Sequence, residues 1–157
     1  MKTAELLITA PEDEPTIITE RFVKASPEFL YEMWTTPEHM RRWLGPRYLE
    51  MPVCEVDLRV GGQYHYVHKA PDGSEYSFRG EYLELDRPHR IVATFIFEEY
   101  PSSIDTVTFE PVDGGTLVHG HTLHQTMESR DAAMASGMEG GMRESYERLD
   151  ELASARN

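Results

Sequence analysis

Turn signals recur at short intervals between residues 48 and 124, and they constrain the fold more than any other feature of the sequence. Pro71-Asp72-Gly73 and Asp113-Gly114-Gly115 each separate two runs in which apolar and polar residues alternate. An Asp-Gly pair between such runs is the strongest short-range signal for a β-hairpin. The pattern therefore predicts an antiparallel meander, with strands over residues 48–60, 63–70, 75–86, 90–99, 104–112 and 116–124.

A strand and two short helices are predicted before the meander. The strand is indicated by β-branched residues over 16–25. Ser26 and Thr36 are each followed by a proline and then a glutamate, which is typical of an N-cap, a first helical position and a first turn. Gly45-Pro46 ends the second helix, because proline cannot continue it.

The C-terminal segment has helical periodicity from a predicted N-cap at Ser129. Apolar residues recur there at steps of three and four, at Met134, Met138, Met142, Tyr146, Leu149, and Leu152 or Ala153. We therefore predict one long C-terminal helix against a curved antiparallel sheet. The fold class is α+β, in a single domain over residues 1–157.

Charge and composition exclude several classes of partner. The net charge of −13 would repel a phosphate backbone or an anionic membrane surface, so we expect neither nucleic acid nor membrane as a partner. Cys54 is the only cysteine, so no internal disulfide can form. The N-terminus has no apolar run long enough for a signal sequence. We expect a cytoplasmic protein, either a monomer or a homodimer.

Histidines gather in two short stretches, but strand geometry argues against a metal site. His65 and His68 are three residues apart, so they point to opposite faces of a strand. Only His119 and His121 share a face, and two ligands fall short of a metal site. No nucleophile motif or phosphate loop occurs. We predict no metal, no cofactor and no established catalytic residue.

Several segments together resemble the SRPBCC (START-like, helix-grip) superfamily. The similar segments are residues 25–46, with their proline-started helices and closing Trp-x-Gly-Pro, and residues 56–91, 107–116 and 137–152. Their order and spacing resemble the branch related to the C-terminal domain of the activator of Hsp90 ATPase. The resemblance covers residues 17–153 and implies a helix-grip fold with a cavity between sheet and helix, where apolar or amphipathic small molecules bind.

The resemblance also implies which residues face that cavity. In relatives, large apolar residues occupy the positions of Tyr64, Tyr66 and His68, which places these three inward. Many relatives have tryptophan at the position of Met142, so methionine there implies a roomier cavity. The predicted ligand-binding residues are Trp43, Tyr64, Tyr66, His68, Phe95, Phe109, His124, Met138, Met142 and Tyr146.

Three functions stay open at this stage. The first is binding of an apolar or aromatic small molecule without catalysis. The second is a co-chaperone or regulatory module with a chaperone partner. The third is a polyketide-cyclase-like or hydrolase-like enzyme in which His68 is the candidate general base. The fold alone does not select among them.

Overall fold

The computed structural model of the protein describes residues 5–155. Its strands are β1 (Leu7–Thr9), β2 (Thr16–Val23), β3 (Glu50–Val56), β4 (Gln63–Lys69), β5 (Glu75–Asp86), β6 (Arg90–Phe97), β7 (Ser103–Val112) and β8 (Gly115–His124). Its helices are α1 (Pro27–Thr35), α2 (Pro37–Trp43), α3 (Met127–Ala135) and α4 (Met138–Ala155). In the described part of the chain, no helix combines the length and apolar character that a membrane crossing requires.

All strands join one antiparallel sheet in the order β1-β2-β8-β7-β6-β5-β4-β3. Strands β3 to β8 are neighbours both in sequence and in space, so the predicted meander is confirmed. The short edge strand β1 was not predicted. Register shifts interrupt the pairing of β3 with β4 between Glu50 and Val53, and that of β5 with β6 between Tyr82 and Glu84. Bulges of this kind bend a sheet, and the sheet curves accordingly.

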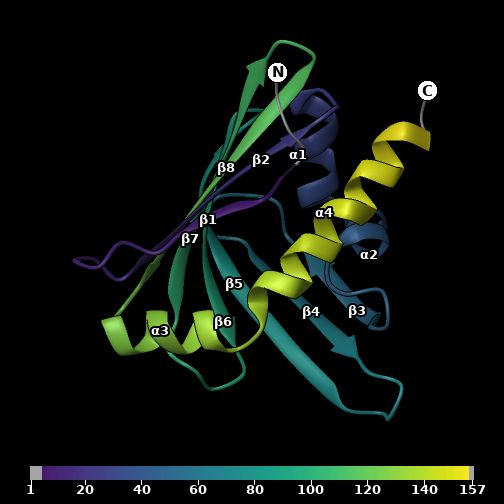
Figure 1. The fold of residues 1–157 in the computed structure, drawn as a ribbon. Coiled ribbons are helices and arrows are strands. Elements are labelled where there is room, and N and C mark those ends of the chain that lie inside the picture. The colour runs from purple at the N-terminus through teal and green to yellow at the C-terminus, as the bar shows by residue number, and fades with distance from the viewer. Residues whose placement is uncertain (1–4, 156–157) are drawn as a thin grey trace.

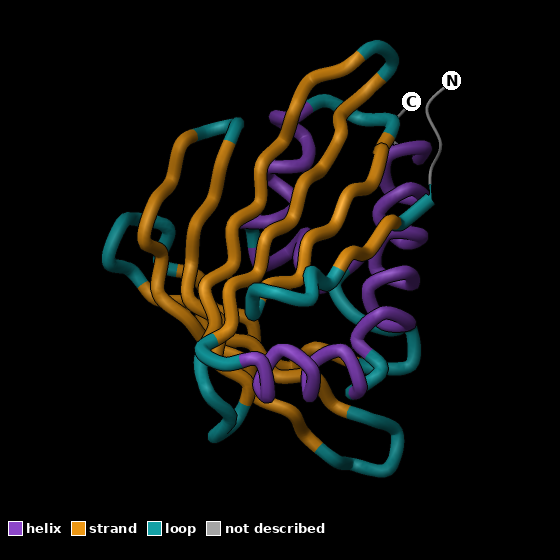
Figure 2. Tube along the Cα trace, turned by 60° about the vertical axis from the view of Figure 1, so that its left-hand side comes forward, coloured by secondary structure: helices purple, strands orange, loops and turns teal. Residues whose placement is uncertain are grey.

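The helices gather on one side of the sheet. Figure 1 shows α4 crossing the sheet diagonally, with α1 and α2 beside it and α3 near one end. Figure 2 shows the strands as a strongly curved layer, with helices behind it, at its right-hand edge and below it in this view. The residues of α4 that are buried, such as Leu149, belong to the same core as Val23, Phe109 and Val118 of the sheet. We call the face that carries these three strand residues the inner face.

The tightly packed core lies where β2 leads into α1 and where β7 turns back into β8. The largest fully buried side chains there are Phe109, Leu30, Leu149, Val23, Val118 and Thr116, whereas Thr16, which is also fully buried, begins β2 at the other end of the sheet. Complete burial of one such apolar side chain contributes about 1.5–3 kcal/mol. This end of the sheet therefore supplies much of the stability of the fold.

The first two helices begin as predicted, but their caps differ. The Ser26 side chain accepts a hydrogen bond from the Phe29 backbone N–H at 3.1 Å, so it caps α1. Thr36 occupies the N-cap position of α2 without a side-chain cap bond. Its hydroxyl donates instead to Glu32 Oε2 at 3.1 Å, on the preceding helix. Thr36 thereby joins the two helices.

The long C-terminal helix is confirmed, but its predicted start at Ser129 is wrong. The segment from Met127 forms a separate helix, α3, in which Thr126 Oγ1 accepts a hydrogen bond from the Ser129 backbone N–H at 3.0 Å. Gly137 then adopts a φ of 86°, in the left-handed region that glycine enters readily. The chain turns there, and α4 begins at Met138.

Candidate functional site

Three neighbouring strands carry a continuous ladder of aromatic rings on the inner face. Tyr66 on β4 stacks on Phe78 of β5, with ring centroids 4.9 Å apart. Phe78 also contacts Phe95 of β6 at 5.7 Å and meets His68 of β4 edge-on at 5.4 Å. Side chains alternate between the two faces of a strand, so each strand adds every second residue to this ladder. Three predicted residues thus lie together, joined by Phe78, which sequence analysis did not single out.

Tyr64 extends the ladder along β4 and is fixed by a hydrogen bond. Its hydroxyl donates to the Thr94 carbonyl oxygen at 2.8 Å, and its ring stacks near Tyr66 at 6.2 Å. Burial raises the pKa of both phenols, and the charge of Asp105 raises the pKa of both further. Both phenols therefore stay neutral at physiological pH, and Asp105 lies close enough to act on them electrostatically.

His68 is enclosed by the turn that follows α2. A β-carbon at Gly45 would lie 2.3 Å from His68 Cε1, so the glycine backbone packs directly on the imidazole. Gly45 is held on α4, because its N–H donates to Ser145 Oγ at 2.7 Å and its carbonyl accepts from Arg148 Nη1 at 2.8 Å. Burial lowers the pKa of His68 to about 4, and the charge of Arg148 contributes to this. The imidazole is therefore neutral at pH 7.

Asp105 places a carboxyl group in the middle of the inner face. It lies opposite Ala93 of β6 and Thr122 of β8, and Thr122 hydrogen bonds to it. Burial raises its pKa to about 6, and no basic side chain among residues 5–155 acts on its charge. Sequence analysis missed this residue. The available signal was its phase, since Asp105 alternates in step with the apolar Val107 and Phe109.

His124 borders the same face at the end of β8. It lies opposite Ser103 of β7, and burial lowers the pKa of its imidazole with a further contribution from the charge of Arg130. Arg130 on α3 is itself buried. Its guanidinium donates to the carbonyl oxygens of Pro11 at 2.8 Å and Thr16 at 3.0 Å. These bonds fix α3 against the turn between β1 and β2.

Three buried polar atoms on the inner face have no hydrogen-bond partner among the described residues. They are His68 Nδ1, Asp105 Oδ1 and His124 Nε2, and a fourth, His39 Nδ1, belongs to α2. Buried polar groups in proteins are nearly always paired, and an unpaired one costs about 1–3 kcal/mol. The three atoms belong to one group that we call the inner-face cluster: Tyr64, Tyr66, His68, Phe78, Phe95, Asp105, Thr122 and His124.

Most side chains of the inner-face cluster are more exposed than those of the core at the other end of the sheet. Val118 and Leu149 in that core are 0% exposed. Most members of the cluster are only half-buried although they lie on the inner face. These are Tyr64, Phe78, Phe95, Asp105, Thr122 and His124. The inner face is thus divided into a dense half and a looser half, and the unpaired polar atoms lie in the looser one.

Other predicted residues belong to the dense core instead. Trp43 is 3% exposed, and its indole N–H donates to the Met33 carbonyl oxygen at 2.8 Å. Phe109 and Tyr146 both contact the ring of Trp34, at 5.2 and 6.3 Å between centroids. The structure therefore does not bring these three residues to the inner-face cluster.

The two methionines predicted to border the cavity both lie at the start of α4. Met138 is the first residue of that helix, and both Met138 and Met142 are half-buried. Met142 packs against the apolar core, which also includes Tyr64 at its edge. The methionines thus belong to the end of α4 that adjoins α3.

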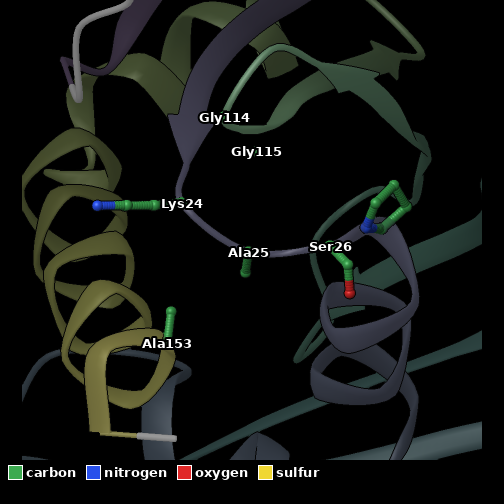
Figure 3. Close-up of a pocket in the computed structure, with 7 residues that line it drawn as sticks. Lys24, Ala25, Ser26, Gly114, Gly115 and Ala153 are labelled. Atoms are coloured by element: carbon green, nitrogen blue, oxygen red, sulfur yellow. The ribbon is translucent and has the colours of Figure 1, made fainter. Parts of the chain in front are cut away.

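A separate recess opens at the opposite end of α4, as Figure 3 shows. Its volume is about 430 Å³, and its lining residues are Lys24, Ala25, Ser26, Pro27, Gly114, Gly115 and Ala153. The predicted ligand-binding residues are all absent from this lining. The recess is therefore distinct from the inner-face cluster.

His65 and His119 lie on the outer face and contact neighbouring side chains. The half-exposed His65 lies with Nε2 3.0 Å from Ser77 Oγ. His119 Nε2 lies 2.8 Å from Glu110 Oε1. No three histidine, cysteine or acidic side chains among residues 5–155 are grouped to hold a metal ion.

Comparison with known proteins shows the family. The family described as "Activator of Hsp90 ATPase homolog 1-like protein" matches residues 24–154. The chain belongs to this family. The assignment agrees with the predicted SRPBCC superfamily, and the matched residues include β3 to β8, α1 to α3 and all of α4 but its last residue. No curated protein sequence matches this Hsp90-activator-like chain significantly.

Solved structures confirm the helix-grip fold of this family member. A protein from Rhodobacter sphaeroides is 28% identical, with a TM-score of 0.91 over 96% of this chain and 99% of that one. A protein from Chromobacterium violaceum is 30% identical, with a TM-score of 0.75 over 88% of this chain and 96% of that one. The AHSA1 protein from Silicibacter pomeroyi shares the fold at 19% identity, with a TM-score of 0.74 over 90% and 99%.

Proposed function

We propose that this protein binds a small molecule with an apolar or aromatic body between the inner-face cluster and the start of α4. The observation that carries the proposal is the group of unpaired buried polar atoms, His68 Nδ1, Asp105 Oδ1 and His124 Nε2, on one aromatic-walled face. A bound molecule with polar groups would satisfy these atoms, while its apolar body would cover the half-buried rings.

The chemistry of the cluster favours binding over catalysis. A pKa of about 4 makes His68 a weak general base at pH 7, because an effective base has a pKa near the working pH. The aromatic rings offer large flat surfaces at a small cost in side-chain entropy. Ligand recognition by stacking and a few polar contacts is thus the function that the cluster supports best.

A neutral fluorescent probe, N-phenyl-1-naphthylamine, tests the proposal. We expect saturable binding with enhanced fluorescence. Met142→Trp should weaken binding at least about tenfold, because the larger ring would extend from a half-buried position of α4 into the proposed binding site. The matched control is Glu147→Trp, which adds the same ring at an exposed position of the same helix.

Two results would contradict this function. One is the absence of saturable probe binding to the wild-type protein. The other is equal binding to the Met142→Trp and Glu147→Trp variants, since the probe would then occupy a different place. Circular dichroism of both variants establishes that each one folds.

Family membership favours a second candidate, a regulatory module that acts on a chaperone ATPase. This candidate predicts that the protein raises the ATPase rate of an Hsp90-type chaperone from the same host. It would act through its surface, so Met142→Trp should leave the stimulation unchanged. No stimulation at a tenfold molar excess would exclude the regulatory function and would not bear on ligand binding.

A further inference from the structure

The charge on the inner face indicates what kind of molecule binds there. Asp105 has an acceptor atom, Oδ1, without a partner, and no basic side chain among residues 5–155 acts on its charge. A buried carboxylate is normally paired with a cation or neutralised. Thr122 supplies one neutral hydrogen-bond donor, which satisfies only part of the carboxylate.

We infer that the ligand is an organic cation, an amine with an apolar or aromatic body, whose N–H group binds Asp105 Oδ1. This inference rests on the proposed function, and it names the ligand class for the same site. An ammonium group would replace the missing counter-charge, and a charge-assisted hydrogen bond is about twice as strong as a neutral one.

The aromatic surroundings of Asp105 suit a cation as well. Tyr64 and Tyr66 lie near enough for the charge of Asp105 to raise the pKa of their phenols. Tyr66 stacks on Phe78, so the carboxylate acts on a group of aromatic rings and not on an isolated phenol. A cation held over an aromatic face gains electrostatic attraction, and the gain is larger where water is excluded.

The arginines near the cluster do not supply the missing charge. Arg148 acts on His68 and donates to the Gly45 carbonyl oxygen, while Arg130 acts on His124 and donates to backbone carbonyls of the β1–β2 turn. Both guanidinium groups are therefore held at the two ends of the cluster, and the carboxylate lies between them. The net charge of −13 would also draw cations rather than anions toward the protein.

Competition against the neutral probe N-phenyl-1-naphthylamine tests the inference with matched pairs. The pairs are benzylamine and benzyl alcohol, tryptamine and tryptophol, and 1-aminodecane and 1-decanol. Within a pair the apolar body is constant, and only the amine is a cation at pH 7.5. We expect at least one amine to bind about tenfold more tightly than the alcohol of its pair, as measured by displacement of the probe. In Asp105→Asn, that ratio should fall to about one.

The outcomes separate this inference from the proposed function. If the wild-type protein binds the probe but every amine binds no better than its alcohol, the ligand is not a cation and the inference is overturned. A preference that survives unchanged in Asp105→Asn would also overturn it. Failure of the probe to bind would instead contradict the proposed function. The readout is the affinity of each amine divided by the affinity of its alcohol. A substitution that changes both affinities equally leaves this ratio unchanged.

Discussion

Replacing Asp105 with asparagine should make the unliganded protein more stable at neutral pH. Burial raises the pKa of this carboxyl from 3.8 to about 6, and no cation among residues 5–155 lowers it again. A rise of this size corresponds to about 3 kcal/mol between the ionised and neutral forms in the folded state. Asp105 is half-buried, so solvent screens part of this energy. We therefore expect the ionised carboxylate to lower the free energy of unfolding by about 2 kcal/mol.

The stability gain should depend on pH in a defined direction. Below pH 3.8 the carboxyl is protonated in both states, so wild type and variant should differ little. As the pH rises from 3.8 to about 6, the unfolded chain ionises more readily than the folded one, and the wild-type protein loses stability. Above pH 6 the loss is complete. Asparagine keeps the shape and the acceptor for Thr122 but cannot ionise.

Urea unfolding at pH 4.0 and pH 7.5 provides the measurement. We expect Asp105→Asn to raise the free energy of unfolding by about 2 kcal/mol at pH 7.5 and by much less at pH 4.0. A variant that is destabilised more at pH 7.5 than at pH 4.0 would refute the reasoning, because the ionised carboxylate would then be a stabilising group. Such a result would show that a partner stabilises the ionised Asp105 carboxylate in the folded protein.

Three further predictions concern the surroundings of the site. Asp150→Ala should lower the free energy of unfolding, measured in urea, by about 2–4 kcal/mol. The Arg21 guanidinium is 5% exposed and bonded to Asp150 at 2.7 Å, so it would lose its counter-charge. A loss below about 0.5 kcal/mol would contradict this prediction. Gly45→Ala should cost more stability by thermal unfolding than Gly73→Ala, since both have positive φ but only the former brings a β-carbon against His68; equal losses would refute the contact. The His68 imidazole should titrate in NMR spectra near pH 4, and titration near 6.5 would show that it is not buried.

Much of the fold could be predicted from local patterns. Turn residues such as Asp113-Gly114 stop and reverse a strand wherever they occur, so the meander was readable from the sequence. Ser26 with the following proline marked the start of α1 for the same local reason. The break at Gly137 was not readable, because the apolar spacing continues through it and only the backbone angle reveals the turn. The strand β1 is too short to show alternation.

The candidate site could be predicted only in part. Alternation along β4 placed Tyr64, Tyr66 and His68 on one face, and the structure brings them together there. Trp43 and Tyr146 were predicted for the same site, and the structure places both in the core against which Tyr64 and Met142 also pack. Sequence spacing shows which residues share a face, but it does not show which part of that face is tightly covered.

The sequence by itself determined the antiparallel meander, the helix pair and the long amphipathic helix, because turn chemistry and periodicity act between residues close along the chain. Only the tertiary structure decided that the charge of Asp105 acts on Tyr64 and Tyr66 without a counter-charge. That relation depends on the register of β6, β7 and β8, and on arginines held elsewhere by backbone carbonyls. Burial and electrostatic environment are properties of the assembled fold, and no local stretch of sequence contains them.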